Sequence, residues 1–239
     1  MKKTLLTAIS AVSCLTALPA LALDVPGNFT ANVGFTTEYS FRGLQQSDEG
    51  PAVQGGIDYS HDSGFYAGVW GSNVDFNDGD QATLETDVYA GFTGETGGLT
   101  WDVGGIYYAY PGADTAREYD FFEIAASVGH DFGFASASAA VNYSPDFYNE
   151  SGDAWYTALY ADVPLPYDFK LSGSLGHQTI DNNTAFGFKD YTDWSLGLGY
   201  NLEGFDLALK YVDTSLDEPG ECADGCDSRV IFSVSKSFQ

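Results

Sequence analysis

The sequence is poor in basic residues. Nine Lys and Arg stand against 34 Asp and Glu in 239 residues, for a formal net charge of −25. A protein that binds nucleic acid needs a positively charged surface to neutralise phosphates, so this balance excludes a nucleic-acid partner. Long apolar runs are also lacking, because no segment approaches the roughly 20 apolar residues of a spanning helix. Aromatic residues, in contrast, make up 15% of the chain, which excludes disorder.

The N-terminus has the layout of a secretory signal peptide. Lys2 and Lys3 precede an uncharged segment that runs from Thr4 to Leu18, and Ala20 and Ala22 form a small-x-small cleavage site. We therefore expect residues 1–22 to be a cleaved signal peptide and residues 23–239 to be one exported domain. Cys14 leaves open a lipoprotein leader, although the three residues before it match that pattern poorly.

Two cysteines remain after cleavage, Cys222 and Cys226. In an exported protein such a nearby pair predicts a disulfide within one loop. The alternative, half of a zinc site, would require two further ligands. We expect no cofactor and no metal.

Apolar and polar residues alternate along the whole mature chain, and no segment has a helical period. In the segment Phe29–Phe41, Phe29, Val33 and Phe35 share one face with Tyr39 and Phe41. This pattern predicts twelve strands, with ten and fourteen as the limits, most of them as long as a tilted membrane strand. The predicted strands are Phe29–Phe41, Ala52–Ser60, Phe65–Val74, Ala82–Thr93, Leu99–Tyr110, Tyr119–Phe132, Phe134–Ser144, Ala154–Val163, Phe169–Gln178, Tyr191–Tyr200, Phe205–Asp213 and Arg229–Phe238.

The connections between these strands alternate in length. Links after even-numbered strands are short, whereas most links after odd-numbered strands are longer and rich in Asp, Asn, Gly and Pro. Short turns at one end and long acidic loops at the other are typical of an all-β, antiparallel transmembrane barrel of the outer membrane. A soluble β-sandwich also alternates. Small residues recur on the polar faces, however, for example at Ser172, Ser174 and Gly176, as expected inside a narrow barrel.

The strand ends carry further membrane features. Val230, Phe232, Val234 and Phe238 form an alternating face that resembles the C-terminal assembly signal of outer-membrane barrels, although Gln239 follows the usual terminal Phe. Aromatic residues recur near many strand ends, as in the belts at membrane interfaces.

The sequence resembles the proteobacterial TorF-type porin family in three segments. These are VGFTTEYSFRGLQQS (33–47), GFYAGVWGSNVD (64–75) and WSLGLGY (194–200). The resemblance extends over nearly the whole mature chain. It implies an outer-membrane barrel. It implies no substrate and no catalytic residue, because the function of that family is itself an inference.

The polar faces supply the candidate functional residues. A charge on the lipid face costs about 2–4 kcal/mol near the midplane for a base, so mid-strand charges are expected to face the lumen. The apolar row of the first strand, which includes Tyr39 and Phe41, is expected to face lipid. Six aromatic residues occupy the same inward-facing positions of the alternation and should narrow the lumen: Tyr66, Trp70, Tyr89, Tyr108, Tyr156 and Tyr160. The lumen and selectivity candidates are Glu38, Arg42, Asp58, Glu85, Asp87, Asp102, Glu123, Asp162, Lys170, Asp193, Asp206, Lys210 and Arg229.

Catalytic and calcium-binding sites are less well supported. Of the three histidines, His177 alone falls near the outer rim, and no partner Ser can be assigned to it, so we predict no enzyme and no catalytic residue. The segment Asp75–Asp80 crowds carboxylates but has Gly79 where a calcium ligand should stand.

These features predict a narrow, cation-preferring channel for small solutes in the outer membrane of Gram-negative bacteria. The expected partners are outer-membrane lipid, lipopolysaccharide, the barrel-assembly machinery and small solutes, chiefly cations. The alternative is a closed barrel that acts through its loops as an adhesin or an envelope-structural protein.

Overall fold

The structure is a computed structural model that describes residues 26–114, 116–222 and 224–239. The predicted signal peptide and Cys14 lie outside the described residues.

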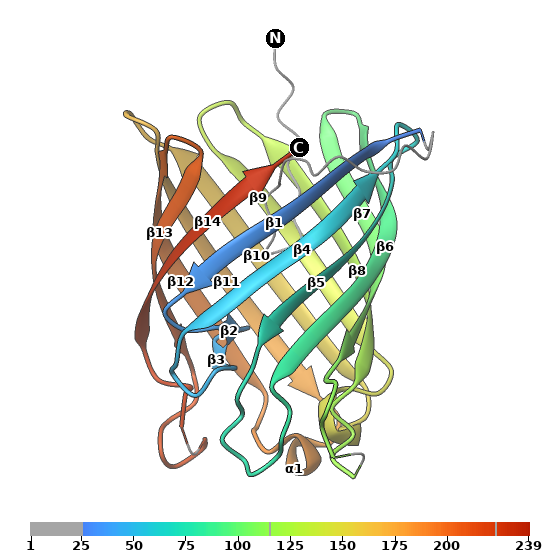
Figure 1. Cartoon of the computed structure of the whole chain (residues 1–239), viewed down its shortest axis with the longest axis vertical. Coiled ribbons are helices and arrows are strands. Elements are labelled where there is room, and N and C mark those ends of the chain that lie inside the picture. The colour runs from blue at the N-terminus through green and yellow to red at the C-terminus, as the bar shows by residue number, and fades with distance from the viewer. Residues whose placement is uncertain (1–25, 115, 223) are drawn as a thin grey trace.

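Twelve antiparallel strands form a closed barrel (Figure 1). β1 pairs with both β4 and β14, which closes the sheet. The wall strands are β1 (Asn28–Thr36), β4 (Ala52–Ser60), β5 (Phe65–Asn73), β6 (Leu84–Thr96), β7 (Leu99–Ala109), β8 (Phe121–Asp131), β9 (Ser136–Ser144), β10 (Ala154–Pro164), β11 (Phe169–Ile180), β12 (Tyr191–Leu202), β13 (Phe205–Thr214) and β14 (Arg229–Phe238). The predicted fold class and strand number are confirmed, and most boundaries agree within three residues.

One predicted strand is wrong in its second half. The first strand ends at Thr36 rather than at Phe41. Beyond it the chain forms a separate two-stranded hairpin, β2 (Ser40–Phe41) and β3 (Leu44–Gln45). The alternation of residues 29–41 therefore runs across the end of a wall strand into a loop.

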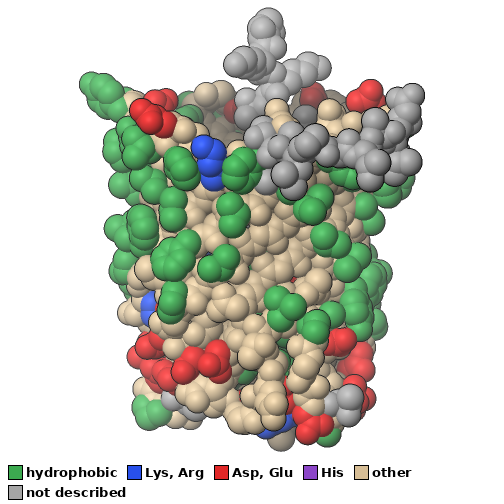
Figure 2. Space-filling model, in the orientation of Figure 1, with side chains coloured by type: hydrophobic (Ala, Val, Ile, Leu, Met, Phe, Trp, Pro, Cys, Tyr) green, Lys and Arg blue, Asp and Glu red, His purple; other side chains and the backbone are tan. Residues whose placement is uncertain are grey.

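The apolar rows predicted from alternation form the outer surface. Phe35 and Val53, which are cross-strand neighbours on β1 and β4, are both exposed, whereas Thr36 and Ala52, the adjacent pair, are buried. Figure 2 shows apolar side chains over the visible wall, with acidic side chains gathered mainly toward its lower end. An apolar band with more polar surface beyond its two edges is the pattern expected of a barrel that faces lipid.

One end of the barrel carries short turns, and we refer to it as the short-turn end. Its connections are residues 61–64, 97–98, 132–135, 165–168 and 203–204, and the C-terminus lies beside them (Figure 1). The link between β6 and β7 is two glycines, Gly97 and Gly98, with φ of 62° and 82°. Positive φ at both positions gives a turn whose twist matches that of the flanking strands, and glycine adopts it without strain.

The opposite end, the long-loop end, carries the connections 37–51, 74–83, 110–120, 145–153, 181–190 and 215–228. These loops contain a short 3₁₀ helix, η1 (Tyr148–Glu150), and one helical turn, α1 (Asn183–Phe186). Among the described residues, no helix is both long and apolar enough to cross a membrane. Loop side chains such as Val74, Tyr110 and Phe147 pack with inward wall residues into a buried cluster, so the main apolar core fills the long-loop half of the barrel.

Candidate functional site

The interior of the barrel differs between its two halves. In the long-loop half, inward side chains such as Glu85, Tyr108 and Gln178 are buried. In the short-turn half, many inward side chains retain exposed surface: the side chain of Lys170 is 59% exposed and that of Asp162 is 38% exposed. The lumen is therefore packed in its long-loop half and more solvent-exposed in its short-turn half.

The loop that follows β1 turns into the lumen. Its hairpin, residues 40–45, has Arg42 and Gly43 at the tip, with φ of 47° and 82°. Such a two-residue turn suits a tight hairpin, and glycine at its second position avoids strain. We call residues 40–45 the lumen hairpin.

The tip of the lumen hairpin reaches the far wall. Arg42 Nη2 lies 2.7 Å from Glu123 Oε2 on β8, and Arg42 Nη1 donates to Gln178 Oε1 on β11 at 2.9 Å. The guanidinium also lies 4.2 Å from the ring centre of Tyr156 on β10, a cation–π contact. Because β8, β10 and β11 lie across the barrel from β1 and β4 in strand order, the hairpin spans the lumen.

A second buried ion pair holds the base of the lumen hairpin. Arg229 Nε on β14 lies 2.5 Å from Glu38 Oε1, and both side chains are about nine-tenths buried. Arg229 Nη2 also donates to the carbonyl oxygen of Gly43 at 2.8 Å. One guanidinium thus connects β14 to both the base and the tip of the hairpin.

Four of the eight candidate carboxylates on the wall are held by tyrosines instead of bases. Tyr66 donates to Asp102 at 2.9 Å, and Tyr156 donates to Asp193 at 3.2 Å. The other two pairs are Tyr39 with Glu85 and Tyr89 with Asp58. A hydroxyl donor orients a carboxylate but, unlike a base, brings no positive charge that would cancel the negative one.

The strand register places all wall candidates on the face that points away from lipid. For example, Asp87 is opposite Trp70, and Glu123 is opposite Ile106, and all four lie in the lumenal phase. The candidates so placed are Asp58, Glu85, Asp87, Asp102, Glu123, Asp162, Lys170, Asp193, Asp206, Lys210 and Arg229. Their part in selectivity stays a prediction.

The bases of the lumen have unequal surroundings. Lys170 lies 3.4 Å from Asp162, whereas Arg42 and Arg229 form the two buried pairs. Lys210 has no carboxylate within ion-pair distance in the described part of the chain, although it lies near enough to Asp193 to interact electrostatically.

Glu38 and Arg42 enter the lumen by a route that the alternation did not predict. Both belong to the inward loop, not to a wall strand. For the same reason Tyr39 and Phe41, predicted to lie on the membrane side, lie inside the barrel: Tyr39 packs against Trp70 and Phe41 against Tyr108. Burial of these two rings inside the barrel gives the loop a reason to fold inward.

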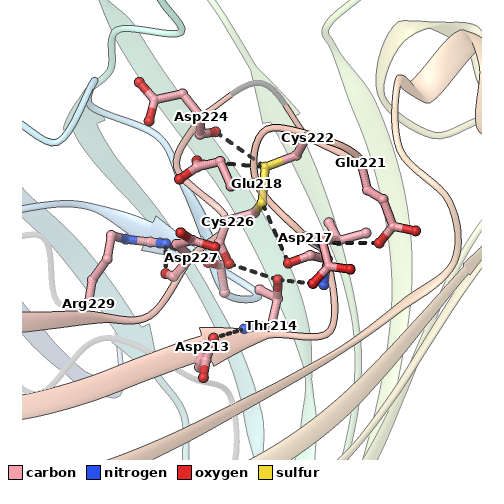
Figure 3. Close-up of a disulfide and its surroundings, with 12 residues drawn as sticks. Asp213, Thr214, Asp217, Glu218, Glu221, Cys222, Asp224, Cys226, Asp227 and Arg229 are labelled. Atoms are coloured by element: carbon pink, nitrogen blue, oxygen red, sulfur yellow. Dashed lines mark hydrogen bonds between the residues drawn. A yellow bond between two sulfur atoms is a disulfide. The ribbon is translucent and has the colours of Figure 1, made fainter.

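The predicted disulfide between Cys222 and Cys226 is confirmed (Figure 3). The sulfurs lie near the carboxylate of Glu218, and together the three could form a small metal-ligand set. The metal-binding form of cysteine is the thiolate, so the bonded sulfurs seen here do not provide that site.

The acidic segment Asp75–Asp80 is tied into neighbouring loops. Asp78 accepts from Arg117 at 3.3 Å and from the hydroxyl of Tyr119. The backbone N–H of Asp114 donates to Asp80, which lowers the pKa of that carboxyl. Burial, with the nearby Asp78, raises the pKa of Tyr119 to about 12. These carboxylates therefore act as loop-organising acceptors.

Gln178 and the apolar cluster around the disulfide could not have been identified as functional from the sequence. Gln178 is fully buried and accepts from Arg42, yet its position in the alternation is that of any inward polar residue. Leu44, Tyr191 and Leu216 form a second buried cluster with the disulfide. Only the Arg-Gly pair at the hairpin tip, a turn-forming dipeptide, offered a local signal.

Porins are among the solved structures that share the fold. The KdgM porin has a TM-score of 0.59 at 10% identity, the NanC porin 0.58 at 10%, and a KdgM porin in complex with disordered oligogalacturonate 0.58 at 9%. Each alignment covers 87% of this chain and 99% of the porin. At such identities the similarity concerns the fold alone. Among curated proteins, none matches the sequence.

A family model described as "Bacterial protein of unknown function (Gcw_chp)" matches residues 22–238. The match includes every wall strand, the lumen hairpin and the loop 215–228 that contains the disulfide. The chain therefore belongs to the Gcw_chp family of bacterial proteins.

Proposed function

We propose that this protein is a narrow, cation-preferring outer-membrane channel for small solutes. The observation that carries the proposal is the way in which the lumenal carboxylates are held. Tyrosine hydroxyls, which carry no positive charge, donate hydrogen bonds to Asp58, Glu85, Asp102 and Asp193. A lumen with an excess of fixed negative charge concentrates cations and repels anions.

The position in the membrane follows from the outer surface. A closed wall with apolar side chains outside satisfies the backbone within the sheet, as a hydrocarbon environment requires. In this orientation the long-loop end faces the exterior and the short-turn end faces the periplasm. The signal peptide expected at residues 1–22, the porin-like fold and the resemblance to TorF-type porins support the same location.

The narrowness follows from the lumen hairpin. Arg42 and Glu38 anchor it to walls on both sides of the lumen, and aromatic side chains pack around it. Solutes that pass it would have to be small or would have to displace it.

The negative charge of the lumen makes an acidic oligosaccharide, the ligand in one of the similar porin structures, a poor candidate solute for this protein. One solved KdgM porin is a complex with oligogalacturonate, which is a polyanion. Here the lumen has few bases, and Arg42 and Arg229 are already paired with carboxylates. We therefore expect small cations or neutral solutes in place of an acidic oligosaccharide.

Outer-membrane lipid, lipopolysaccharide and the barrel-assembly machinery are the partners that this function requires. The last strand, β14, turns Val230 and Phe232 to the outer surface and ends at Phe238, as expected of an assembly signal. The loops 74–83 and 215–228 are acidic and could meet divalent cations that bridge lipopolysaccharide.

The second candidate is a closed barrel that acts through its loops as an adhesin or an envelope-structural protein. The packed cluster in the long-loop half favours it, because this cluster joins loops and wall into one core. Conductance of purified protein in planar bilayers separates the two. Discrete small steps are expected of the channel. Silent bilayers, together with a binding phenotype on trimming residues 215–228, would contradict the channel and support the closed barrel.

A further inference from the structure

The loop between β13 and β14 touches the lumen hairpin. We call residues 215–228 the disulfide loop. The backbone N–H of Gln45 donates to the carbonyl oxygen of Gly225 at 2.9 Å, and Gly225 lies within the segment that the disulfide closes. A Cβ atom at Gly225 would lie only 1.8 Å from Gln45 Cγ, so the Gln45 side chain packs directly on the backbone of Gly225, where only glycine leaves room for it.

The disulfide itself is part of this contact. Leu44 of the lumen hairpin packs with Cys222 and Cys226, which are 4% and 0% exposed. The carbonyl oxygen of Cys226 accepts from Thr214 Oγ1 at 2.8 Å, which ties the closed segment to the end of β13 (Figure 3). The disulfide therefore lies inside the barrel mouth, not at the tip of a free loop.

The guanidinium of Arg229 contacts both the last residues of the disulfide loop and the lumen hairpin. Arg229 Nη1 donates to the carbonyl oxygen of Asp227 at 2.5 Å (Figure 3). The same side chain binds Glu38 and the carbonyl oxygen of Gly43. A change in the path of the disulfide loop would thus be transmitted to the lumen hairpin through two residues, Gly225 and Arg229.

We propose that the Cys222–Cys226 disulfide is a redox-sensitive latch that holds the lumen hairpin across the channel. A dithiol reductant would break the sulfur–sulfur bond and leave two thiols, with two electrons and two protons transferred while the dithiol closes to its own disulfide. The freed segment samples more conformations, so the Gln45–Gly225 hydrogen bond and the packing on Leu44 weaken. The hairpin then moves more readily, and the lumen widens. As a statement about gating, this inference rests on the proposed channel function.

Two readouts on the full chain test the latch, and only one requires a conducting channel. The first is amide hydrogen exchange at Gln45 and its neighbours in the oxidised protein and in the Cys222→Ser/Cys226→Ser variant. We expect exchange about tenfold faster in the variant, as local opening becomes easier. The second is bilayer conductance, in which the variant should open more often or in larger steps. Asp224→Asn, an exposed change in the same loop, is the matched control and should alter neither readout.

Folding is checked first by the heat-dependent gel mobility of the purified barrel. Dithiothreitol should reproduce the effect of the serine variant in the parent protein, with reduction verified by mass, and should have no effect on the serine variant. Unchanged exchange in a folded serine variant overturns the latch, whether or not the bilayers conduct. If exchange is faster in the serine variant but both proteins form channels of the same conductance, the disulfide does not gate the channel. Faster exchange with silent bilayers for both proteins supports the latch on the hairpin and contradicts the channel.

Discussion

The guanidinium of Arg42, at the tip of the lumen hairpin, and the carboxylate of Glu123, on the wall strand β8, lie 2.7 Å apart, although 81 positions separate the two residues. Their side chains are only 7% and 2% exposed. Removal of one partner from a buried ion pair leaves a charge without compensation, whereas removal of both is tolerated far better. This pair therefore links the stability of the barrel to the position of the lumen hairpin.

Arg42→Ala should destabilise the barrel and increase its conductance. The loss of the guanidinium leaves Glu123 buried without its cation, which typically costs about 3–5 kcal/mol. It also releases the hairpin tip from Gln178. Urea unfolding in lipid vesicles measures the first effect, and single-channel recording measures the second.

The double variant Arg42→Ala/Glu123→Gln is the matched control. It removes the unpaired charge, so it should recover part of the lost stability while the conductance stays high. A fall in stability with unchanged conductance in both variants would indicate a closed lumen.

Adjacent positions on β11 test which face meets lipid. Leu175 is exposed on the outer surface, whereas the Ser174 hydroxyl lies 2.6 Å from that of Ser195 inside the barrel. Leu175→Arg should lower the free energy of unfolding by about 2–4 kcal/mol in vesicles. Ser174→Arg should leave it nearly unchanged and instead reduce cation preference. Equal destabilisation by the two changes would contradict the assigned register.

The tyrosine-held carboxylates should control selectivity through their charge. Asp58→Asn combined with Asp102→Asn keeps an oxygen that Tyr89 and Tyr66 can donate to but removes two negative charges. One unit charge about 4 Å from a cation in water is worth about 1 kcal/mol, so the cation-to-anion permeability ratio should fall several-fold. Tyr89→Phe/Tyr66→Phe, which keeps both charges, should leave more of that ratio intact. The reverse order of effects would indicate that the hydroxyls, and not the charges, select.

An ion pair between two external loops should be visible in a titration. Lys189 Nζ lies 2.5 Å from Glu221 Oε1, and this hydrogen bond, with the backbone N–H of Asp217, lowers the pKa of Glu221. Because the pKa of Glu221 is lowered in the folded state, its ionised carboxylate stabilises the fold at any pH above the ordinary pKa of the carboxyl. This stabilisation is lost as the pH falls through the lowered pKa and the carboxylate is protonated. Lys189→Gln should raise the pKa of Glu221 toward its usual range in an NMR titration. An unchanged pKa would show that the backbone donor alone accounts for the shift.

The wall of the barrel was predictable because its physics is local. The exposed row that contains Phe35 and Val53 follows from the two-residue period of a strand with lipid on one face. The period also placed Glu123 and Asp102 inside the lumen. The strand count followed because the alternation is interrupted by short turns on one side and by longer links rich in Asp, Asn, Gly and Pro on the other.

The inward loop and its contacts in the lumen were not predictable, because they depend on parts of the chain that are distant in sequence. Tyr39 and Phe41 continue the alternation of β1, and nothing local distinguishes a ring that meets lipid from one that meets Trp70 or Tyr108. The pairing of Arg42 with Glu123 required the barrel to close first. The disulfide could be predicted from two nearby cysteines, but its packing against Leu44 could not.

The most direct measurement is the reversal potential of the purified oxidised protein in a planar bilayer, under a tenfold gradient of potassium chloride. Perfect selectivity for a monovalent ion would give about 59 mV. A lumen whose carboxylates outnumber its free bases should give a potential of the sign set by potassium, below that limit, and Asp58→Asn/Asp102→Asn should move it toward zero. A potential of the sign set by chloride, or no conductance from correctly folded protein, would contradict a cation-preferring channel.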